Sequence, residues 1–500
     1  MKDFFKTHSS LITIFGLIIL SIIPIYVAFI YPHNYLSDDY LITLTFVKNI
    51  IKGNGWVFNY PPPVLATTTP LFTIVISLIA YVLPFLEITQ IAVFFTSICL
   101  IAIIWIFFFA KRILRISNSF VIFISFLIII SMKTSILGME LYFFTLILIL
   151  AIISYYKKSH FICGILTALL FLTRGEGVLL LIIFVIIQIV SYIKSSKEKD
   201  FINSQIKIKS IKNLVFGFFL PFLIWTVYSL YTFGNIFPNT LSAKLAQKQS
   251  GIWVSFTKLL FTEWLPNWSK QYNLFNIKWL SLWYPIITIG LITVIKKHKK
   301  WIIFLYWVIL YIFGYSLLGV SGYTWYGFHI YFVLMLLYGF GIFSVSEFIY
   351  KMKKGFYSYL FLIIFLFISV YPIIRTNWDK MFSPRISSTS KVYYKMSKWI
   401  KNNIEPSKTI AYFEIGYLGY YTNNKIFDLV GLTNPKVLKY IANRNFSQGF
   451  WDACPDYLIY KKGSYFQPYV KYSKKFKSNY IQIHTFENKK TQFIIYKRKY

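Results

Sequence analysis

The chain has 500 residues, of which 57% are hydrophobic and only 14% charged, and its mean hydropathy is +0.59. Long apolar runs recur down to about residue 375, which excludes an ordinary soluble protein and predicts a polytopic α-helical membrane protein. A formal net charge of +35 would suggest nucleic acid in a soluble chain. Here the basic residues fall in short loops and in the C-terminal part, so membrane topology and anionic lipid explain them, and no nucleic-acid partner is expected.

Eleven apolar runs are predicted to span the membrane, several of them short or interrupted. The runs are 11–30, 89–110, 119–136, 140–155, 161–172, 176–194, 213–231, 279–295, 302–319, 328–349 and 356–374. With eleven spans, every Lys- and Arg-rich connection lies in the cytoplasm, as the positive-inside rule requires. The N-terminus is then inside the cell, and the C-terminal part is exported.

Two further segments are predicted to be helices that do not cross the membrane. Residues 68–84 are apolar, but as a twelfth span they would turn every later basic loop outward, so we interpret them as re-entrant or interfacial. Residues 39–52 are amphipathic and predict a helix along the outer surface, which Gly53-Asn54-Gly55 ends.

The composition changes after the last apolar run. We therefore divide the chain into a transmembrane domain, residues 1–375, and a small exported α/β domain, residues 376–500. The second part is long enough to build its own core. Its clearest strand-like segments are 409–413, 457–460 and 493–496.

The first chemical candidates are Asp38 and Asp39, which follow the first apolar run within Ser37-Asp38-Asp39-Tyr40. Two adjacent carboxylates at a membrane face are costly unless water, a cation or a cationic partner satisfies them. A carboxylate in this place suits a general base that takes a proton from an attacking hydroxyl. The alternative is that Asp38 only caps the helix that follows it.

Arg174 and Glu176 are predicted at the outer end of a hairpin between two apolar helices. Arg174 offers a planar fork for a phosphate or pyrophosphate, or else it pairs with Glu176 to stabilise the turn. Glu140, at the outer start of another helix, is either a polar group of a cavity or a favourable charge at that helix N-terminus.

Lys244 and His329 are the remaining candidates on the predicted outer face. Lys244 lies in the long outer loop 232–278, where one Lys among many is either solvated or functional. His329 follows an aromatic cluster, residues 323–326, at the start of an apolar run. Such a cluster either lines a sugar or polyprenyl site or belongs to the membrane interface.

These outer-face motifs resemble, in the same order along most of the chain, those of bacterial GT-C glycosyltransferases, especially the arabinofuranosyltransferase-like and mannosyltransferase-like members. The motifs are DDYLI (38–42), GNGWVFN (53–59), TTTPL (67–71), LGME (137–140), LTRGEG (172–177), PNT (238–240) with Lys244, and IGYLGY (415–420) with DLVGL (428–432). Two departures are Gly175, where that family has Pro, and Thr67, where it often has a Gly-Tyr or similar pair. Neither departure removes a charged group.

The resemblance implies a GT-C fold and an inverting transferase in the bacterial cytoplasmic membrane. The enzyme would move a sugar from a polyprenyl-phosphate donor to a cell-envelope glycan or glycolipid on the exported side. Some GT-C enzymes use a divalent cation and others do not, and the sequence leaves metal dependence, donor sugar, acceptor and oligomeric state open.

The resemblance also implies roles for single residues. Asp38 is the expected general base, and Asp39 the neighbour that positions the acceptor or a cation. The departing lipid phosphate is expected to meet three cations: Arg174, Lys244 and His329. The polar groups expected to line the cavity around them are Glu140, Glu176 and Tyr40.

Two other functions stay open on the sequence alone. Charged groups inside a membrane also mark the substrate path of a transporter or flippase for a lipid-linked or anionic substrate. A protein O-mannosyltransferase-like enzyme is the other, although the ordered motifs fit it less well. Clustering of the polar residues on one predicted face, followed by an exported domain, favours the transferase over the transporter.

Overall fold

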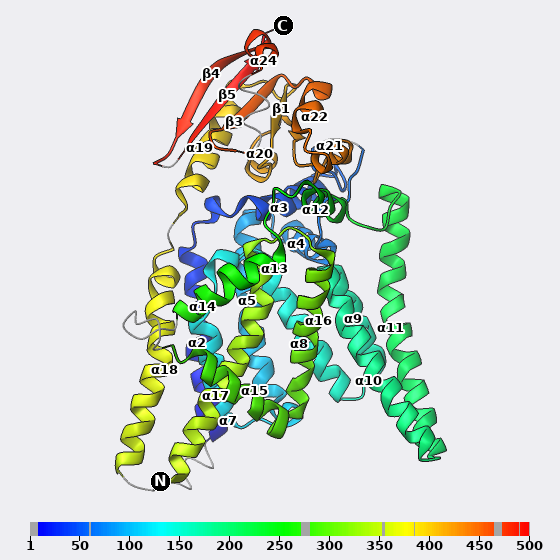
Figure 1. Ribbon diagram of the computed structural model, residues 1–500, viewed down its shortest axis with the longest axis vertical. Coiled ribbons are helices and arrows are strands. Elements are labelled where there is room, and N and C mark those ends of the chain that lie inside the picture. Colours follow the sequence, from blue (N-terminus) through cyan, green and yellow to red (C-terminus); the bar gives the residue numbers. More distant parts are fainter. Residues whose placement is uncertain are drawn as a thin grey trace. The chain divides into compact units, whose positions relative to one another are not determined.

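The computed structural model describes residues 9–59, 62–271, 281–352, 356–384, 386–464, 473–489 and 491–499. The protein is mostly helical, with a small sheet near the C-terminal end (Figure 1). The chain divides into two compact units, and each is assembled from three separate stretches of sequence. The first unit comprises Met1–Tyr31, Val93–Leu223 and Ser255–Pro384, and the second comprises Pro32–Ala92, Ile224–Val254 and Arg385–Tyr500.

Within the described residues, seven helical segments are long and apolar enough to cross a membrane, judged by length and composition. They are α2 (Ser9–Ile30), α5 (Ile88–Phe109), α10 (Val178–Lys197) with η3 (Gly175–Gly177), α11 (Phe201–Phe233), α16 (Ile302–Leu318) with η6 (Lys299–Trp301), α17 (Gly327–Met352) with η7 (Thr324–Tyr326), and α18 (Phe356–Phe382). Two of the five boundaries between the units fall within helices, one in α5 and one in α11.

Shorter helices occupy the other four predicted spans. They are α7 (Asn118–Ile130), α8 (Leu141–Tyr156), α9 (His160–Thr173) and α15 (Trp283–Lys297). All eleven predicted runs therefore contain a helix, but the run 119–136 is helical only to Ile130 and then turns through η2 (Thr134–Ile136). A helix of 13 to 16 residues is shorter than the roughly 20 residues that span a bilayer on their own.

Several predicted connections are helical instead. The basic stretch 194–212 was expected to be a loop, but α10 runs to Lys197 and α11 begins at Phe201. The predicted outer loop 232–278 also contains helices, and its residues 272–278 lie outside the described chain. These helices are α12 (Asn239–Ser250), α13 (Phe256–Leu259), η4 (Leu260–Trp264) and α14 (Leu265–Gln271). The sequence analysis placed helices by their apolar runs, and these connecting helices are too polar or too short to contain one.

The second unit contains a five-stranded sheet with the order β2-β1-β3-β5-β4. The strands are β1 (Thr409–Tyr412), β2 (Lys425–Asp428), β3 (Tyr457–Lys461), β4 (Tyr480–Glu487) and β5 (Gln492–Arg498). β1 is parallel to both of its neighbours, whereas β5 is antiparallel to β3 and β4. The three predicted segments correspond to β1, β3 and β5, while β2 and β4 had not been predicted.

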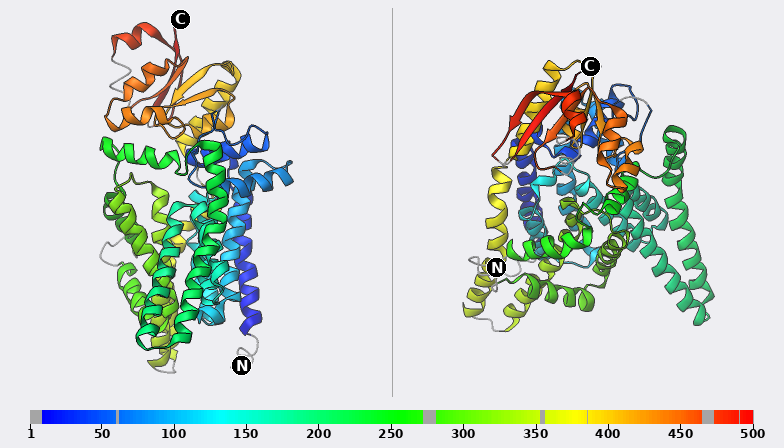
Figure 2. Two further views of the ribbon diagram at one scale, coloured as in Figure 1. Left: turned by 90° about the vertical axis from the view of Figure 1, so that its right-hand side faces the viewer. Right: turned by 45° about the horizontal axis from the view of Figure 1, so that its top comes forward.

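Helices cover both faces of this sheet (Figure 2). On one face, Ala411 of β1 packs in an apolar cluster with Phe450 of α22 (Phe446–Ala453) and Phe476 of α24 (Lys474–Asn479). On the other face, the ring of Tyr412 lies 6.2 Å from that of Tyr393 in α19 (Ser388–Asn403). Alternation of side chains along the strand thus places successive residues in two different layers.

Helix α3 (Asp38–Ile51) is the predicted amphipathic helix, and other parts of the second unit cover it. Most of its side chains are buried, including Tyr40, Leu44 and Phe46. It packs against α4 (Pro70–Val82) and α20 (Gly416–Tyr421), which cover the side that the sequence pattern assigned to membrane or solvent. The helix ends as predicted, with Gly53 in the left-handed region at φ 77°.

Candidate functional site

Asp38 is buried and is held by backbone groups far away in the sequence. One carboxylate oxygen accepts a hydrogen bond from the N–H of Gly416 and the other from the N–H of Tyr417, each at 2.9 Å. These N–H groups open helix α20, so the Asp38 carboxylate caps that helix. The alternative in which Asp38 caps its own helix is therefore not what the structure shows: Ser37 is the N-cap of α3, and its side chain makes no capping hydrogen bond.

The backbones approach closely at this point. A β-carbon on Gly416 would lie 1.9 Å from the carbonyl oxygen of Asp38, so only glycine fits. The Tyr417 hydroxyl donates a hydrogen bond of 2.6 Å to the carbonyl of Leu36. Residues 36–38, at the start of α3, therefore pack tightly against residues 416–417, at the start of α20.

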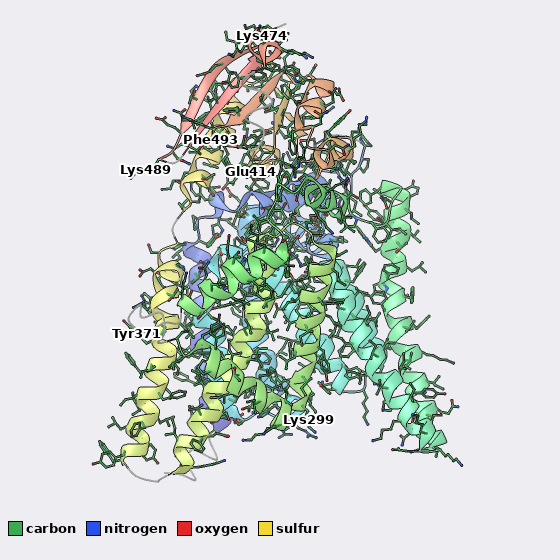
Figure 3. The ribbon with its side chains drawn as sticks, in the orientation of Figure 1. Lys299, Tyr371, Glu414, Lys474, Lys489 and Phe493 are labelled. Atoms are coloured by element: carbon green, nitrogen blue, oxygen red, sulfur yellow. The ribbon has the colours of Figure 1, made fainter. Side chains whose placement is uncertain are left out.

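Further carboxyl groups gather around Asp38 at the carboxyl ends of β1 and β2. Glu414 follows β1 and is labelled in Figure 3, and Asp428 ends β2. Burial raises the pKa of Asp38, and Glu414 raises it further, against the lowering effect of its two N–H donors. Burial likewise raises the pKa of Glu414, with Asp39 adding to the effect and Lys461 opposing it. Carboxyl ends of parallel strands are a common place for ligand sites.

Glu414 was missed by the sequence analysis. The signal was present, because Glu414 is an acidic residue directly after a predicted strand in a chain with only 17 acidic residues. Its proximity to Asp39 rests on a contact across nearly 400 positions, which no local pattern reveals.

Two other motifs of the second unit, PNT (238–240) and DLVGL (428–432), meet at the same edge of the sheet. Asp428 accepts hydrogen bonds from the N–H groups of Val430 and Thr433, both at 2.8 Å, which shape the turn after β2. The Asn239 side chain donates to the carbonyls of Gly431 and Leu432, at 2.8 and 2.7 Å, and so ties the start of α12 to that turn.

Lys244 and Tyr40 also belong to the second unit. Lys244 is half-buried on helix α12, not in a loop as predicted, and Tyr40 is buried on α3. Asp39 is half-buried and more exposed than Asp38.

In the first unit, Arg174 is buried between two carboxylates. Its Nε lies 2.5 Å from Oε1 of Glu176, and its Nη1 lies 2.5 Å from Oε1 of Glu140. The guanidinium also lies 5.5 Å from the ring of Tyr326. The predicted Arg174–Glu176 pair is thus present, and it extends to the loop before α8.

His329 completes this cluster. Its Nε2 lies 3.5 Å from Oε1 of Glu176, whose other oxygen accepts a hydrogen bond of 3.1 Å from Tyr315. The imidazole is buried among aromatic rings, with ring-centre distances of 4.6 Å to Phe144 and 5.4 Å to Trp307. A charged group in such apolar surroundings persists only when it is paired, which explains why the buried Arg174 lies between two carboxylates.

The predicted site residues therefore fall into two groups. The second unit holds Asp38, Asp39, Tyr40 and Lys244, and the first unit holds Glu140, Arg174, Glu176 and His329. Among the residues that the structure describes, no three His, Cys, Asp or Glu side chains are arranged to hold a metal ion.

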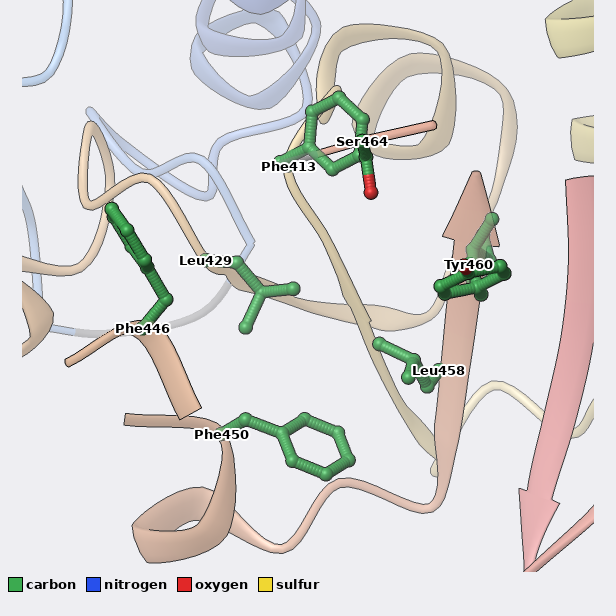
Figure 4. A pocket seen from close by; sticks show the side chains of 8 residues that line it. Phe413, Leu429, Phe446, Phe450, Leu458, Tyr460 and Ser464 are labelled. Carbon is green, nitrogen blue, oxygen red and sulfur yellow. The ribbon is translucent and has the colours of Figure 1, made fainter. Parts of the chain in front are cut away.

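A small apolar hollow lies inside the second unit and is shown in Figure 4. The residues that line it are Phe413, Leu429, Phe446, Phe450, Leu458, Ile459, Tyr460 and Ser464. Its volume is about 10 Å³, which is room for no more than one water molecule. We interpret it as a gap in the core and not as a ligand site.

Comparison with protein families finds one match, to a domain of unknown function (DUF8728) over residues 384–497. This stretch corresponds closely to the C-terminal part of the second unit. It begins two residues after the end of α18, and the boundary predicted at residue 375 falls within that helix. A comparison with curated proteins finds no match.

Proposed function

We propose that the protein is a membrane glycosyltransferase of the GT-C type that uses a polyprenyl-phosphate sugar and inverts the anomeric centre. The observation that carries the proposal is the gathering of Asp38, Asp39 and Glu414 at the edge of the sheet, where burial raises the pKa of Asp38 and of Glu414. Carboxyl groups with pKa values raised toward neutrality suit general-base catalysis near pH 7.

Within the pair, we assign the base to Asp39. Asp38 is buried, and each of its carboxylate oxygens accepts a hydrogen bond from a backbone N–H group, so its role is to cap α20. Asp39 is half-buried, and its negative charge adds to the burial that raises the pKa of Glu414. The two carboxyl groups therefore share a site at which uptake of one proton relieves the repulsion between like charges. This reverses the order expected from the resemblance, which placed the base at Asp38.

The leaving phosphate is assigned to Lys244. The Arg174 cluster contains one guanidinium and two carboxylates, so with a neutral imidazole its formal charge is −1. It therefore has no surplus positive charge to offer a phosphate. Lys244 is half-buried on α12, whose first residue is tied to the turn after β2, in the same unit as Asp39.

In the proposed reaction, a hydroxyl oxygen of the acceptor attacks the anomeric carbon from the face opposite the phosphate. The new C–O bond forms as the bond from carbon to the phosphate oxygen breaks, and the electron pair leaves with the polyprenyl phosphate. The hydroxyl proton passes to Asp39. Phosphate is a good leaving group, so one base and one cation suffice.

One observation favours a second candidate, a transporter for an anionic or lipid-linked substrate. The Glu140–Arg174–Glu176–His329 cluster is buried at the ends of apolar helices, and charged groups of this kind also occur along transport paths. Uptake of the labelled donor by proteoliposomes, without a new glycosidic bond, would support this candidate and exclude the transferase.

The decisive experiment uses the purified full-length protein in detergent with a panel of labelled polyprenyl-phosphate pentoses and hexoses and envelope glycolipid acceptors. The variants are Asp39→Asn, Asp38→Asn and Lys244→Ala. The matched control is Asp379→Asn, because Asp379 is exposed on α18. We expect Asp39→Asn to lose at least 100-fold in transfer rate, the usual contribution of a general base, without any loss of thermal stability.

The variants separate the two aspartates. Asp38→Asn should lower the melting temperature as well as the rate, because an amide cannot accept both N–H groups. Transfer by Asp39→Asn at the wild-type rate would exclude Asp39 as the base. Failure of the wild type with every donor would reject the proposed function.

A further inference from the structure

The first unit contains a hollow of about 220 Å³ that is separate from the cluster around Arg174. It lies between the start of α7, the end of α15 and the last turns of α17. The residues that line it are Arg115, Ile116, Ser117, Phe120, Thr293, Lys297, His298, Phe340, Phe343, Ser344 and Glu347.

The hollow lies at the opposite end of α17 from His329. Glu347 follows His329 by 18 positions in the same helix, which corresponds to about 27 Å at 1.5 Å per residue. Lys299, directly after His298, is labelled at the lower end of the helices in Figure 3. This distance is close to the hydrocarbon thickness of a bilayer, about 30 Å, so the hollow and the Arg174 cluster lie toward opposite ends of a helix of membrane length.

The floor of the hollow is aromatic and rigid. Phe120 and Phe340 stack with ring centres 4.5 Å apart, and Phe343 meets Phe120 at 5.2 Å. The walls are fixed because α15 and α17 cross at a glycine contact: a β-carbon on Gly290 would lie 1.8 Å from the carbonyl oxygen of Leu337. Such a crossing brings two helix backbones together and leaves the side chains beyond it to frame a hollow.

The rim is basic and rich in hydrogen-bond donors. Arg115 and Lys297 are exposed there, and Ser117 caps α7 by accepting from the N–H of Phe120, so the positive end of that helix dipole faces the rim. Nδ1 of His298 is buried and has no hydrogen-bond partner among the residues that the structure describes. Glu347 is the one carboxylate among the lining residues, which leaves the rim with a net positive charge.

We propose that this hollow binds the phosphate-bearing headgroup of an anionic lipid. Arg115 and Lys297 supply the charge, the N-terminus of α7 adds its positive dipole end, and the aromatic floor accepts the first carbons of the lipid. Basic pockets between membrane helices on the cytoplasmic side are suited to this ligand chemistry. The basic loops at this end are the ones predicted to be cytoplasmic, where anionic lipid is abundant.

The test measures lipid binding to the full-length protein in nanodiscs or detergent, with phosphatidylglycerol as the probe and phosphatidylcholine as the neutral comparison. The double variant Arg115→Gln/Lys297→Gln is compared with Arg112→Gln/Lys296→Gln. The control pair is also exposed and carries the same charge, but neither residue lines the hollow. We expect the first pair to weaken phosphatidylglycerol binding about 30-fold (about 2 kcal/mol) and the control pair less than 3-fold.

A loss of binding could also come from misfolding, so the test includes a variant that is expected to bind phosphatidylglycerol more tightly. Glu347→Gln removes the opposing carboxylate and should tighten phosphatidylglycerol binding several-fold. Equal losses in the two double variants, or no loss in either, would overturn the proposal, because binding would then depend on surface charge alone or occur elsewhere. Inorganic phosphate forms the last arm: if it binds at millimolar concentration with the same sensitivity to the variants, the site takes a free anion and the lipid assignment is rejected.

Discussion

The carboxylate of Asp38 and the backbone of Gly416 are joined by a hydrogen bond of 2.9 Å, although 378 residues separate them. The bond belongs to a helix cap whose two halves come from the N-terminal and C-terminal parts of the chain. Because both oxygens of Asp38 accept hydrogen bonds in this cap, we propose the neighbouring Asp39 as the general base. The relationship also makes the packing at position 416 testable.

Gly416→Ala is expected to destabilise the protein by about 1–3 kcal/mol, the usual cost of forcing an extra methyl group into a packed site. The new β-carbon would lie 1.9 Å from the Asp38 carbonyl oxygen, so α20 must move away from α3. The measurement is the melting temperature of the purified protein. Gly314→Ala is the control, because no heavy atom lies within 4 Å of a β-carbon there. Equal melting temperatures for wild type and Gly416→Ala would contradict the close approach.

Stability should fall as the pH rises through the acidic range. The folded protein holds the pKa of Asp38 and Glu414 at about 7, above the value of about 4 for an unfolded carboxyl. The folded state thus binds more protons than the unfolded state between about pH 4 and 7. The stability that these two groups contribute is therefore fully present below about pH 4 and is lost as the pH rises to about 7. Melting temperatures measured from pH 4 to 8 should decline over this window.

Glu414→Gln tests the origin of that decline, because glutamine does not ionise. The variant should show a shallower decline and a higher melting temperature than the wild type at pH 8. Glu263→Gln is the control, since Glu263 is exposed in η4. A Glu414→Gln profile that overlays the wild type would locate the pH dependence elsewhere.

Arg174→Ala should cost about 3–5 kcal/mol, because it leaves the carboxylates of Glu140 and Glu176 buried without their cation. Arg174→Lys should be intermediate, since an ammonium keeps the charge but not the planar fork that reaches both partners. Folded yield and melting temperature in detergent are the measurements. Arg112→Ala, at an exposed position, should match the wild type. An Arg174→Ala protein as stable as the wild type would show that the carboxylates find other partners.

Asn239→Ala should loosen the turn after β2, because the side chain donates to the carbonyls of Gly431 and Leu432. We expect a loss of about 1–2 kcal/mol and faster hydrogen–deuterium exchange at residues 429–433. Asn239→Asp should be more severe, since a carboxylate would face two carbonyl oxygens. Asn443→Ala, at an exposed site, is the control. Unchanged exchange in Asn239→Ala would mean that Asp428 shapes the turn alone.

Much of the helical architecture was predictable, because each membrane-length run carries its own apolar signal. The runs around α2, α5 and α16 agree with the observed helices within a few residues. The burial of α3 was not predictable. Its amphipathic pattern says that one side meets an apolar environment, but not that α20, nearly 400 positions later, covers another side.

The residue types of the candidate site were predictable from the sequence, but their contacts were not. Motif order grouped Asp38 and Arg174 as chemically relevant, and both are buried among polar partners. The pairing of Arg174 with Glu140, and the tie from Asp38 to Gly416, depend on tertiary contacts that spacing along the chain does not encode. Glu414 was missed because its significance comes only from what surrounds it.

The split helix cap also orders the events of biosynthesis. Asp38 leaves the ribosome early, whereas the N–H donors of Gly416 and Tyr417 arrive only after most of the chain has been made. The Asp38 carboxylate is therefore without these two donors until Gly416 and Tyr417 have been added. A stop codon before residue 416 would leave the carboxylate without its helix, and an isolated 384–497 fragment would begin α20 without its cap. The Asp38 cap of α20 therefore requires that synthesis has passed residue 417.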